Sequence, residues 1–362
     1  MSSVRLPGLV DPHVHLREPG GEHKEDFESG TRAALAGGVT MVLAMPNTLP
    51  PLVDAASLGL AEAAARKKAV CDYGLHLGGS SANGETAAAL ADRVTGLKLY
   101  LDVTYGPLHI KDLGALREHL ARWPKDRPVL CHAEERTMAA VLMIAHLENR
   151  RVHICHVSRK AEIELIRDAR MRGIDVTCEV TPHHLFLTED DIPNFPRPGR
   201  AEVRPRLASK ADQDALWANM EFIDCIASDH APHTLAEKDG ENPPPGFPGL
   251  ETSLALMLTA VHDGRIDLDA VVARMADNPR RLFNLPEQPD TWIEVDPDAT
   301  WTARNEDMIT RCAWTPFAGA VLRGRVQKVT LRGQRVLEDG QFFVQPGTGR
   351  NLAPACRSVI MT

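Results

Sequence analysis

Residues 8–21, GLVDPHVHLREPGG, combine an apolar run with two histidines, an arginine and a Pro-Gly-Gly break. Alternate residues of a β-strand point to the same face of the sheet, so His13, His15 and Arg17 are expected to converge on one spot. A buried strand that ends in three polar side chains predicts a functional site at its carboxyl end.

Seven further apolar runs follow along the chain. They are VTMVLAMP (39–46), CDYGLHLG (71–78), GLKLYL (96–101), RPVLCHAE (127–134), RVHICHVS (151–158), DVTCEVTPHH (175–184) and IDCIASDH (223–230). Helical spacing of apolar residues lies between several of them, at 55–69 after a candidate N-cap at Asp54, at 135–150 and at 159–173. Eightfold alternation of strand and helix predicts an α/β fold, the (β/α)8 TIM barrel. A doubly wound open sheet is the alternative, but no Gly-rich phosphate loop follows the first run to support it.

The pattern of apolar and polar residues changes near residue 288. From there, short runs alternate apolar and polar residues between glycines. This pattern predicts a small appended β-module formed mainly by the C-terminal segment. We divide the chain into a metal-dependent barrel, residues 8–287, and a β-rich module with a tail, residues 1–7 and 288–362. Because the first barrel strand begins almost at residue 1, we expect the chain to be a domain of a longer polypeptide.

Composition narrows the class of protein. The 362 residues are 43% hydrophobic and 25% charged with a net charge of -8, which is ordinary for a globular protein and argues against nucleic acid as the main partner. Seven scattered cysteines without a CxxC pair indicate reduced thiols. Since neither a signal peptide nor a membrane-length apolar run is found, we expect a cytoplasmic protein without a membrane partner.

The ends of the predicted strands carry side chains that bind metals. These are His13, His15, Lys98, His132, Cys155, His156, Glu179 and Asp229. Imidazole nitrogens together with a carboxylate are the ligand set of zinc and similar divalent metals. A single histidine of this kind is often an ordinary core residue, but four histidines and an aspartate at four strand ends favour a metal site.

Lys98 is the unusual member of this set, because an ammonium group repels metal ions. A deprotonated lysine that reacts with CO2 gives a carbamate, which is a carboxylate able to bridge two metals. The alternative is a barrel lysine paired with an acid.

Seven motifs together resemble the dihydroorotases of the amidohydrolase superfamily. They are HVHLREPG (13–20), MPNT (45–48), GLKLY (96–100), CHAE (131–134), HICHVS (153–158), EVTPHHLFL (179–187) and ASDHAPHT (227–234). Residues 236–251, AEKDGENPPPGFPGLE, and 314–319, WTPFAG, are similar to the dihydroorotase domain of the animal CAD polyprotein. The resemblance implies a homodimer and neighbouring carbamoyl-phosphate synthetase and aspartate transcarbamoylase domains in one multifunctional enzyme.

The resemblance also implies a role for each candidate ligand. His13, His15 and Asp229 would bind one Zn2+, His132 and His156 a second, and carbamylated Lys98 would bridge the two. A third Zn2+ would be bound by Cys155, Glu179 and His132. The alternative is that Cys155 is a small buried residue and that Glu179 orients a histidine.

Substrate contacts follow from the same resemblance. Arg17, Asn47 and Arg204 would hold the substrate carboxylate, with His233 assisting and the backbone near Pro245 contacting the ring. A guanidinium group suits this role because it binds a carboxylate in a bidentate fork. Residues 101–111 would form a flexible loop with Thr104 and Tyr105 at its tip. Relatives tend to carry Thr-Phe there, so Tyr105 is a departure.

The implied activity is the reversible cyclisation of N-carbamoyl-L-aspartate to L-dihydroorotate in de novo pyrimidine biosynthesis. In the hydrolytic direction a metal-bridging hydroxide attacks the ring carbonyl, and Asp229 acts as general base and then as general acid. Two rival functions stay open at this point. One is hydrolysis of another cyclic amide, by a dihydropyrimidinase, hydantoinase or allantoinase. The other is a catalytically dead scaffold.

Overall fold

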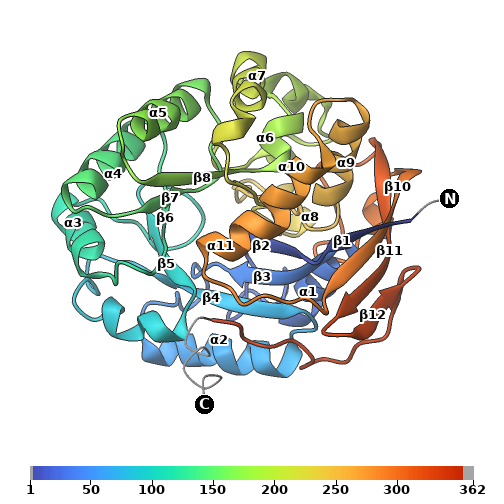
Figure 1. The fold of residues 1–362 in the computed structure, drawn as a ribbon, viewed down its shortest axis with the longest axis horizontal. Coiled ribbons are helices and arrows are strands. Elements are labelled where there is room, and N and C mark those ends of the chain that lie inside the picture. Colours follow the sequence, from blue (N-terminus) through green and yellow to red (C-terminus); the bar gives the residue numbers. More distant parts are fainter. Residues whose placement is uncertain (1–2, 354–362) are drawn as a thin grey trace.

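The computed structural model describes residues 3–353, and an eight-stranded parallel sheet forms its centre (Figure 1). The strands lie side by side in chain order: β2 (Leu9–Val14), β3 (Val39–Ala44), β4 (Asp72–Gly78), β5 (Gly96–Tyr100), β6 (Val129–His132), β7 (Val152–Ile154), β8 (Val176–Val180) and β9 (Cys225–Ile226). Each lies within one of the eight apolar runs, and nearly all of their residues are buried. The predicted α/β architecture is therefore confirmed.

The two ends of the strand order are joined, which distinguishes a nearly closed barrel from an open sheet. Val14 at the end of β2 forms a parallel bridge with His230, which follows β9, and the His15 backbone N–H donates to the His230 carbonyl over 2.8 Å. The Asp11 carboxylate reinforces this closure. It accepts the backbone N–H groups of Ser228, at 3.1 Å, and of His13, also at 3.1 Å.

Most of the helices surround the barrel on the outside (Figure 1), and a few lie at its two ends. They are α1 (Phe27–Ala36), α2 (Ala55–Lys68), α3 (Leu113–Arg122), α4 (Glu135–Leu147), α5 (Lys160–Met171), α6 (Pro182–Phe186), α7 (Lys210–Ala218), α8 (Leu235–Lys238), α9 (Ser253–His262), α10 (Leu268–Val272) and α11 (Asn278–Leu282). The predicted cap at Asp54 is confirmed, since its carboxylate accepts the Ser57 N–H at the start of α2. Between β4 and β5 a 3-10 helix, η1 (Ala87–Arg93), takes the place of an α-helix. No helix within residues 3–353 has both the length and the apolar character to cross a bilayer.

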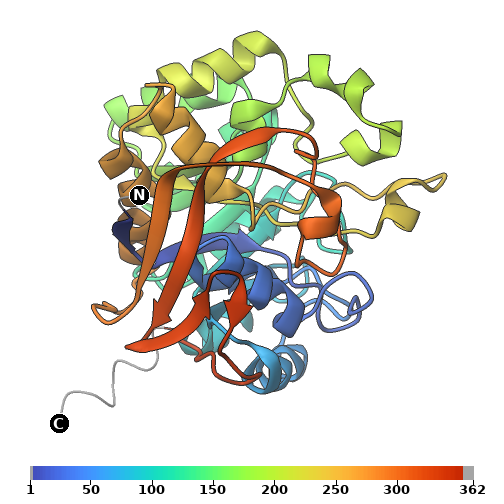
Figure 2. The ribbon, with the colours of Figure 1, turned by 90° about the vertical axis from the view of Figure 1, so that its right-hand side faces the viewer.

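A second, antiparallel sheet packs against one side of the barrel (Figures 1 and 2). Its strands are β1 (Val4–Pro7), β10 (Trp292–Thr302), β11 (Val321–Leu331), β12 (Gln334–Glu338) and β13 (Gln341–Phe342). The predicted β-module is thus confirmed, and β1 joins it from the opposite end of the chain by pairing with β10. The exact boundary between barrel and module stays our proposal, and residues 354–362, which we assigned to the tail, lie outside the described part of the chain.

The module and the barrel meet where β11 crosses α9. Gly324 has a φ of +84°, and a Cβ atom there would lie 2.3 Å from the Leu258 Cδ1 atom of α9. Only glycine fits this backbone conformation and this close approach.

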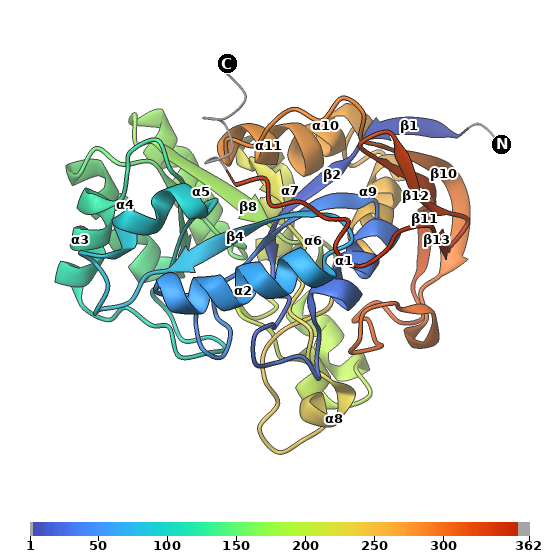
Figure 3. The same ribbon diagram turned by 90° about the horizontal axis from the view of Figure 1, so that it is seen from below.

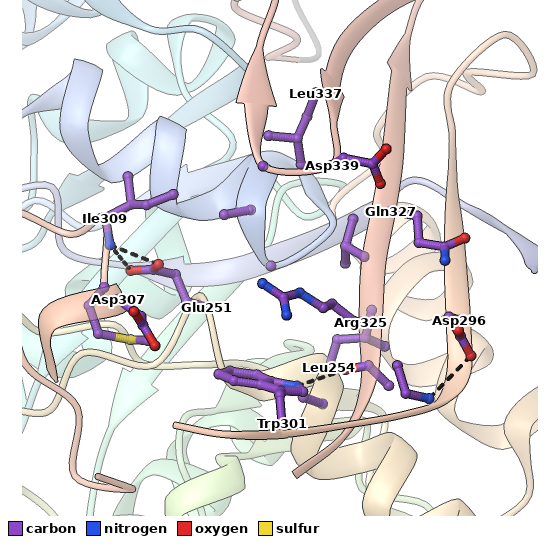
Figure 4. Close-up of a pocket in the computed structure, with 18 of the residues that line it drawn as sticks. Glu251, Leu254, Asp296, Trp301, Asp307, Ile309, Arg325, Gln327, Leu337 and Asp339 are labelled. Atoms are coloured by element: carbon purple, nitrogen blue, oxygen red, sulfur yellow. Dashed lines mark hydrogen bonds between the residues drawn. The ribbon is translucent and has the colours of Figure 1, made fainter. Parts of the chain in front are cut away.

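A groove also lies between α9 and the module, and Figure 4 shows its lining. Glu251 is half-buried there, and its carboxylate accepts the backbone N–H groups of Ile309 and Thr310. Burial raises the pKa of Glu251 to about 7. Neither of the two clusters of metal-capable side chains found among the described residues lies in this groove.

The closure of the barrel gives a first prediction. We expect Asp11→Ala to lower the free energy of unfolding by about 3 kcal/mol, because two buried N–H groups lose their acceptor. Urea unfolding followed by circular dichroism measures the change. Asp126→Ala, at an exposed carboxylate, is the matched control. Equal stability of the two variants would contradict the assigned role of Asp11.

The Glu251 carboxyl gives a prediction for pH dependence. Its pKa in the folded state, about 7, lies above its ordinary value of 4.5, so this group favours folding most below pH 4.5. Between pH 4.5 and 7 the unfolded chain releases the proton that the folded chain retains, and the free energy of unfolding falls by about 3 kcal/mol. Burial also raises the pKa of Asp11 to about 7, so part of the fall has another source. Urea titrations across this pH range should therefore show a fall that is smaller by about 3 kcal/mol in Glu251→Gln than in Glu306→Gln, at an exposed side chain. Equal falls in the two variants would reject the assignment.

Candidate active site

A small cavity lies at the carboxyl ends of the barrel strands. Its lining residues are His13, His15, Arg17, Asn47, Tyr100, Thr104, Tyr105, His132, His156, Arg204, Asp229, Ala231, Pro245 and Gly246. Figure 3 shows the segment with α8 extending from the barrel at the end opposite α10 and α11. The remaining candidates, Lys98, Cys155, Glu179 and His233, do not line the cavity but contact residues of the site.

Three side chains from the two joined ends of the barrel converge on one point. The Nε2 atoms of His13 and His15 lie 3.2 and 3.1 Å from Asp229 Oδ1. The Nδ1–H of His13 donates to Glu179, and the Nδ1–H of His15 donates to Asn47 Oδ1 over 2.7 Å. With both protons on Nδ1, two imidazole lone pairs point at a carboxylate oxygen. Acceptors that face one another in this way fit a shared divalent cation.

The pKa values of these three side chains are consistent with a shared cation. Burial and the charge of Lys98 lower the pKa of His13 to about 4, and burial lowers the pKa of His15 well below its ordinary value. Burial also raises the pKa of Asp229. Two neutral imidazole rings thus lie beside a carboxyl group whose ionisation is disfavoured. A proton or a cation bound at Asp229 is stabilised in these surroundings.

A second pair of histidines comes from neighbouring strands. His132 ends β6, His156 follows β7, and their Nδ1 and Nε2 atoms lie 2.9 Å apart. The other two ring nitrogens, His132 Nε2 and His156 Nδ1, are buried without a hydrogen-bond partner. His156 has a φ of +36°, a conformation rare for residues with a side chain. This bend after Cys155 turns two adjacent side chains inward, which a regular strand would not allow.

Lys98 is fully buried on β5, and its Nζ donates to Cys155 Sγ over 2.9 Å. Within residues 3–353 no carboxylate forms an ion pair with it. The alternative, a barrel lysine paired with an acid, therefore has no support among the described residues. Burial raises the pKa of the Cys155 thiol well above its ordinary value, although the charge of Lys98 opposes this.

Cys155 and Glu179 group with a different histidine from the expected one. Their ligand atoms and one from His13 lie within 4.8 Å of one another, and His132 is not in this group. Glu179 also accepts from His153 Nε2 over 3.1 Å. Burial opposes ionisation of Glu179, but His13 and His153 lower its pKa well below the ordinary value. The geometry thus accommodates both a metal ligand and a carboxylate that orients His13.

The side of the cavity opposite the histidines is rich in donors. Arg17 is buried with a φ of +60°, its Nε donates to the Pro232 carbonyl over 3.1 Å, and its Nη1 has no partner. Arg204 is half-buried and donates to Glu202. An unpartnered buried guanidinium nitrogen fits an anionic ligand group.

The loop 101–111 covers this donor-rich side. The Tyr105 ring lies 4.9 Å from the Arg17 guanidinium and 4.8 Å from the His233 ring, and its carbonyl accepts the Asn47 Nδ2–H over 2.9 Å. In this closed arrangement the cavity has room for about one or two water molecules. A ring-sized ligand therefore enters only when Tyr105 moves.

Three residues of the site were missed by the sequence analysis. Asp11 precedes His13 by two positions, and the same alternation could have placed it on the common face. Tyr100 follows Lys98 by two positions, so alternation again gives the signal. Lys24 lies in a turn, contacts His233 and Tyr105, and has no periodic signal in the sequence.

The sequence is similar to those of several known proteins. A profile of the amidohydrolase family matches residues 4–285. The chain is 53% identical to the multifunctional protein pyr1-3 of Dictyostelium discoideum and 51% identical to the multifunctional protein CAD of Squalus acanthias, in each case over 96% of this chain but 16% of the relative. It is 35% identical to a dihydroorotase of Pyrococcus furiosus over 95% of this chain and 84% of that protein.

Two solved structures have folds similar to that of this chain. The inactive dihydroorotase-like domain of a CAD-like multifunctional protein from Chaetomium thermophilum has a TM-score of 0.84 and 30% identity, and covers 98% of this chain and 100% of its own. An L-hydantoinase (dihydropyrimidinase) from Arthrobacter aurescens has a TM-score of 0.90 and 26% identity, and covers 97% and 89%. Together with the family profile over residues 4–285, these likenesses show that the chain belongs to the amidohydrolase family.

Proposed function

We propose that this chain is a zinc-dependent dihydroorotase that interconverts N-carbamoyl-L-aspartate and L-dihydroorotate in de novo pyrimidine biosynthesis. The observation that carries the proposal is the unpartnered Nη1 of buried Arg17 in the same cavity as His13, His15 and Asp229. L-Dihydroorotate presents a carboxylate on the same small ring as the amide bond to be cleaved, so it can satisfy both sides of this cavity at once.

The lone pairs that converge on the cavity support two Zn2+ ions per subunit. His13, His15 and Asp229 would hold one, His132 and His156 the other, and a CO2-derived carbamate on Lys98 would join them. Such ions, when bound, lower the pKa of water and polarise a carbonyl group. We also propose a third Zn2+ at Cys155, Glu179 and His132, the set that the resemblance implies.

The residues of the chain divide the chemistry between them. Arg17, Asn47 and Arg204 bind and orient the substrate carboxylate, and the backbone near Pro245 contacts the ring. Asp229, whose pKa is raised by burial, takes a proton from the attacking water and passes it to the leaving ring nitrogen. Ring closure reverses these transfers and consumes a proton, so acidic conditions favour L-dihydroorotate.

Neither rival function accounts for all of these features. Hydantoin and dihydrouracil carry no carboxylate for Arg17, although the fold is shared with a hydantoinase. The fold is also shared with an inactive domain, but this chain retains every candidate ligand that the resemblance implies.

The setting of the enzyme is part of the proposal. The similarity to segments of multifunctional proteins supports neighbouring carbamoyl-phosphate synthetase and aspartate transcarbamoylase domains in one polypeptide. We also propose a homodimer in the cytoplasm with no nucleic acid or membrane partner. All six cysteines among the described residues are buried and unpaired, which is consistent with a reducing compartment.

A substrate panel tests the activity. We expect the zinc-loaded protein to hydrolyse L-dihydroorotate and to leave dihydrouracil, hydantoin and allantoin essentially untouched, as followed by loss of ultraviolet absorbance. Arg17→Met should raise KM for dihydroorotate by about 10- to 100-fold, because a charged hydrogen bond to the carboxylate is lost. Arg66→Met, at a lysine- and arginine-rich end of α2 far from the cavity, is the matched control. Faster hydrolysis of hydantoin than of dihydroorotate would refute the proposal.

The metal assignment has its own test. Lys98→Ala should lose most of its zinc, measured by plasma emission spectrometry after dialysis, and should fall at least 100-fold in turnover. Addition of a short carboxylic acid should restore part of the metal content in this variant, because a free carboxylate can occupy the place of the carbamate. Full zinc occupancy in Lys98→Ala without added acid is the outcome that would exclude the bridge.

A further inference from the structure

Lys24 is a buried cation in the turn between β2 and α1, next to the donor-rich side of the cavity. Resting on the proposed function, we infer that Lys24 is a positioning residue. It fixes the proton of His233 on Nε2, which keeps Arg17 free to bind substrate, and it anchors the tip of the loop through the hydroxyl of Tyr105.

The argument begins with the hydrogen bonds of the ammonium group. Lys24 Nζ lies 2.8 Å from Glu237 Oε1, 3.1 Å from His233 Nδ1 and 3.1 Å from Tyr105 Oη. An ammonium group has three N–H donors and no acceptor, so these three contacts use all of its donors. Burial opposes ionisation of Glu237, but its hydrogen bond with Lys24 lowers its pKa to about 2, so the Glu237 carboxylate that accepts from Lys24 is ionised.

The contact with Lys24 determines the tautomer of His233. Since Nδ1 accepts from Lys24, the ring proton is on Nε2, where it donates to the Pro245 carbonyl over 3.1 Å. Burial, Arg17 and Lys24 all lower the pKa of His233, so the ring is neutral and has a single N–H.

This tautomer has a consequence for Arg17. Its Nη2 lies 3.0 Å from His233 Nε2, and with a proton on each atom neither can accept from the other. The N–H groups of Nη2 therefore stay available for an anionic ligand, next to those of the unpartnered Nη1. In the opposite tautomer Nε2 would accept from Arg17 and would compete with the substrate carboxylate. Lys24 thus acts on substrate binding through His233.

The same ammonium contacts the loop. Tyr105 Oη accepts from Lys24, and Lys24 Nζ also lies 4.6 Å from the centre of the Tyr105 ring. A phenylalanine at this position would keep the ring contacts with His233 and Arg17 but would lose the hydrogen bond. One buried cation therefore links the tautomer of a binding residue to the closed position of the loop.

The experiment uses the full-length, zinc-loaded chain and three variants. Lys24→Met removes the donors at similar volume, and Tyr105→Phe removes only the loop contact. Lys210→Met removes an exposed lysine that pairs with Asp214 and is the control. The tautomer of His233 is read by NMR on protein labelled with [15N]histidine, and His233→Gln identifies its resonances. KM and kcat for L-dihydroorotate are measured in parallel.

We expect the His233 proton to lie on Nε2 in the wild type, in Lys210→Met and in Tyr105→Phe, and to move to Nδ1 in Lys24→Met. KM should rise about 10-fold or more in Lys24→Met, because Arg17 then donates to His233 in competition with the substrate carboxylate. The change in kcat should be smaller. Should Lys24→Met fail to fold, Glu237→Gln, which weakens the anchoring of Lys24, should shift the same resonances in the same direction.

An unchanged Nε2–H tautomer in Lys24→Met would overturn the inference, and so would an unchanged KM. The NMR measurement does not depend on turnover. A wild type that leaves dihydroorotate untouched would therefore refute the proposed function, while the tautomer in Lys24→Met would still decide the positioning role of Lys24.

Discussion

The site depends on one contact between the two ends of the barrel. The Asp11 carboxylate and the bridge from Val14 to His230 join segments more than 200 residues apart in the chain. Because strand β2 ends beside the segment after β9, His13 and His15 meet Asp229. Without this closure the parallel sheet would still bury its apolar strands, but its first and last polar ends would lie at opposite edges.

The cavity that results has two chemically opposite sides. One side presents lone pairs from His13, His15 and Asp229, and the other presents the N–H groups of Arg17. Each side alone is unfavourable when buried, since acceptors repel acceptors and an unpaired guanidinium loses its hydration. Under the proposed function, a cation on one side and an anionic substrate group on the other would resolve both problems. The arrangement would then favour a ligand with a carboxylate by charge and not by shape alone.

Much of the fold and of the candidate site could be predicted because both repeat a simple rule. Eight apolar runs gave eight strands, and residues at their carboxyl ends, such as His132 and His156, had to meet at one rim. Neighbours across the barrel were harder to predict. That Cys155 and Glu179 lie with His13 depends on how the strands are staggered, which spacing along the chain does not report. Lys24 could not be found at all, because its partners come from two separate loops without periodicity.

The loop tip shows how the free enzyme satisfies groups that await a ligand. The Tyr105 carbonyl accepts from Asn47, and its ring lies over Arg17. Under the proposed function, substrate would replace these contacts, and the loop would move to admit it. The hydroxyl of Tyr105 strengthens the closed state through Lys24, since the hydrogen bond has a charged donor. A phenylalanine at position 105 would lack this bond, and the balance between open and closed loop would shift toward the open state.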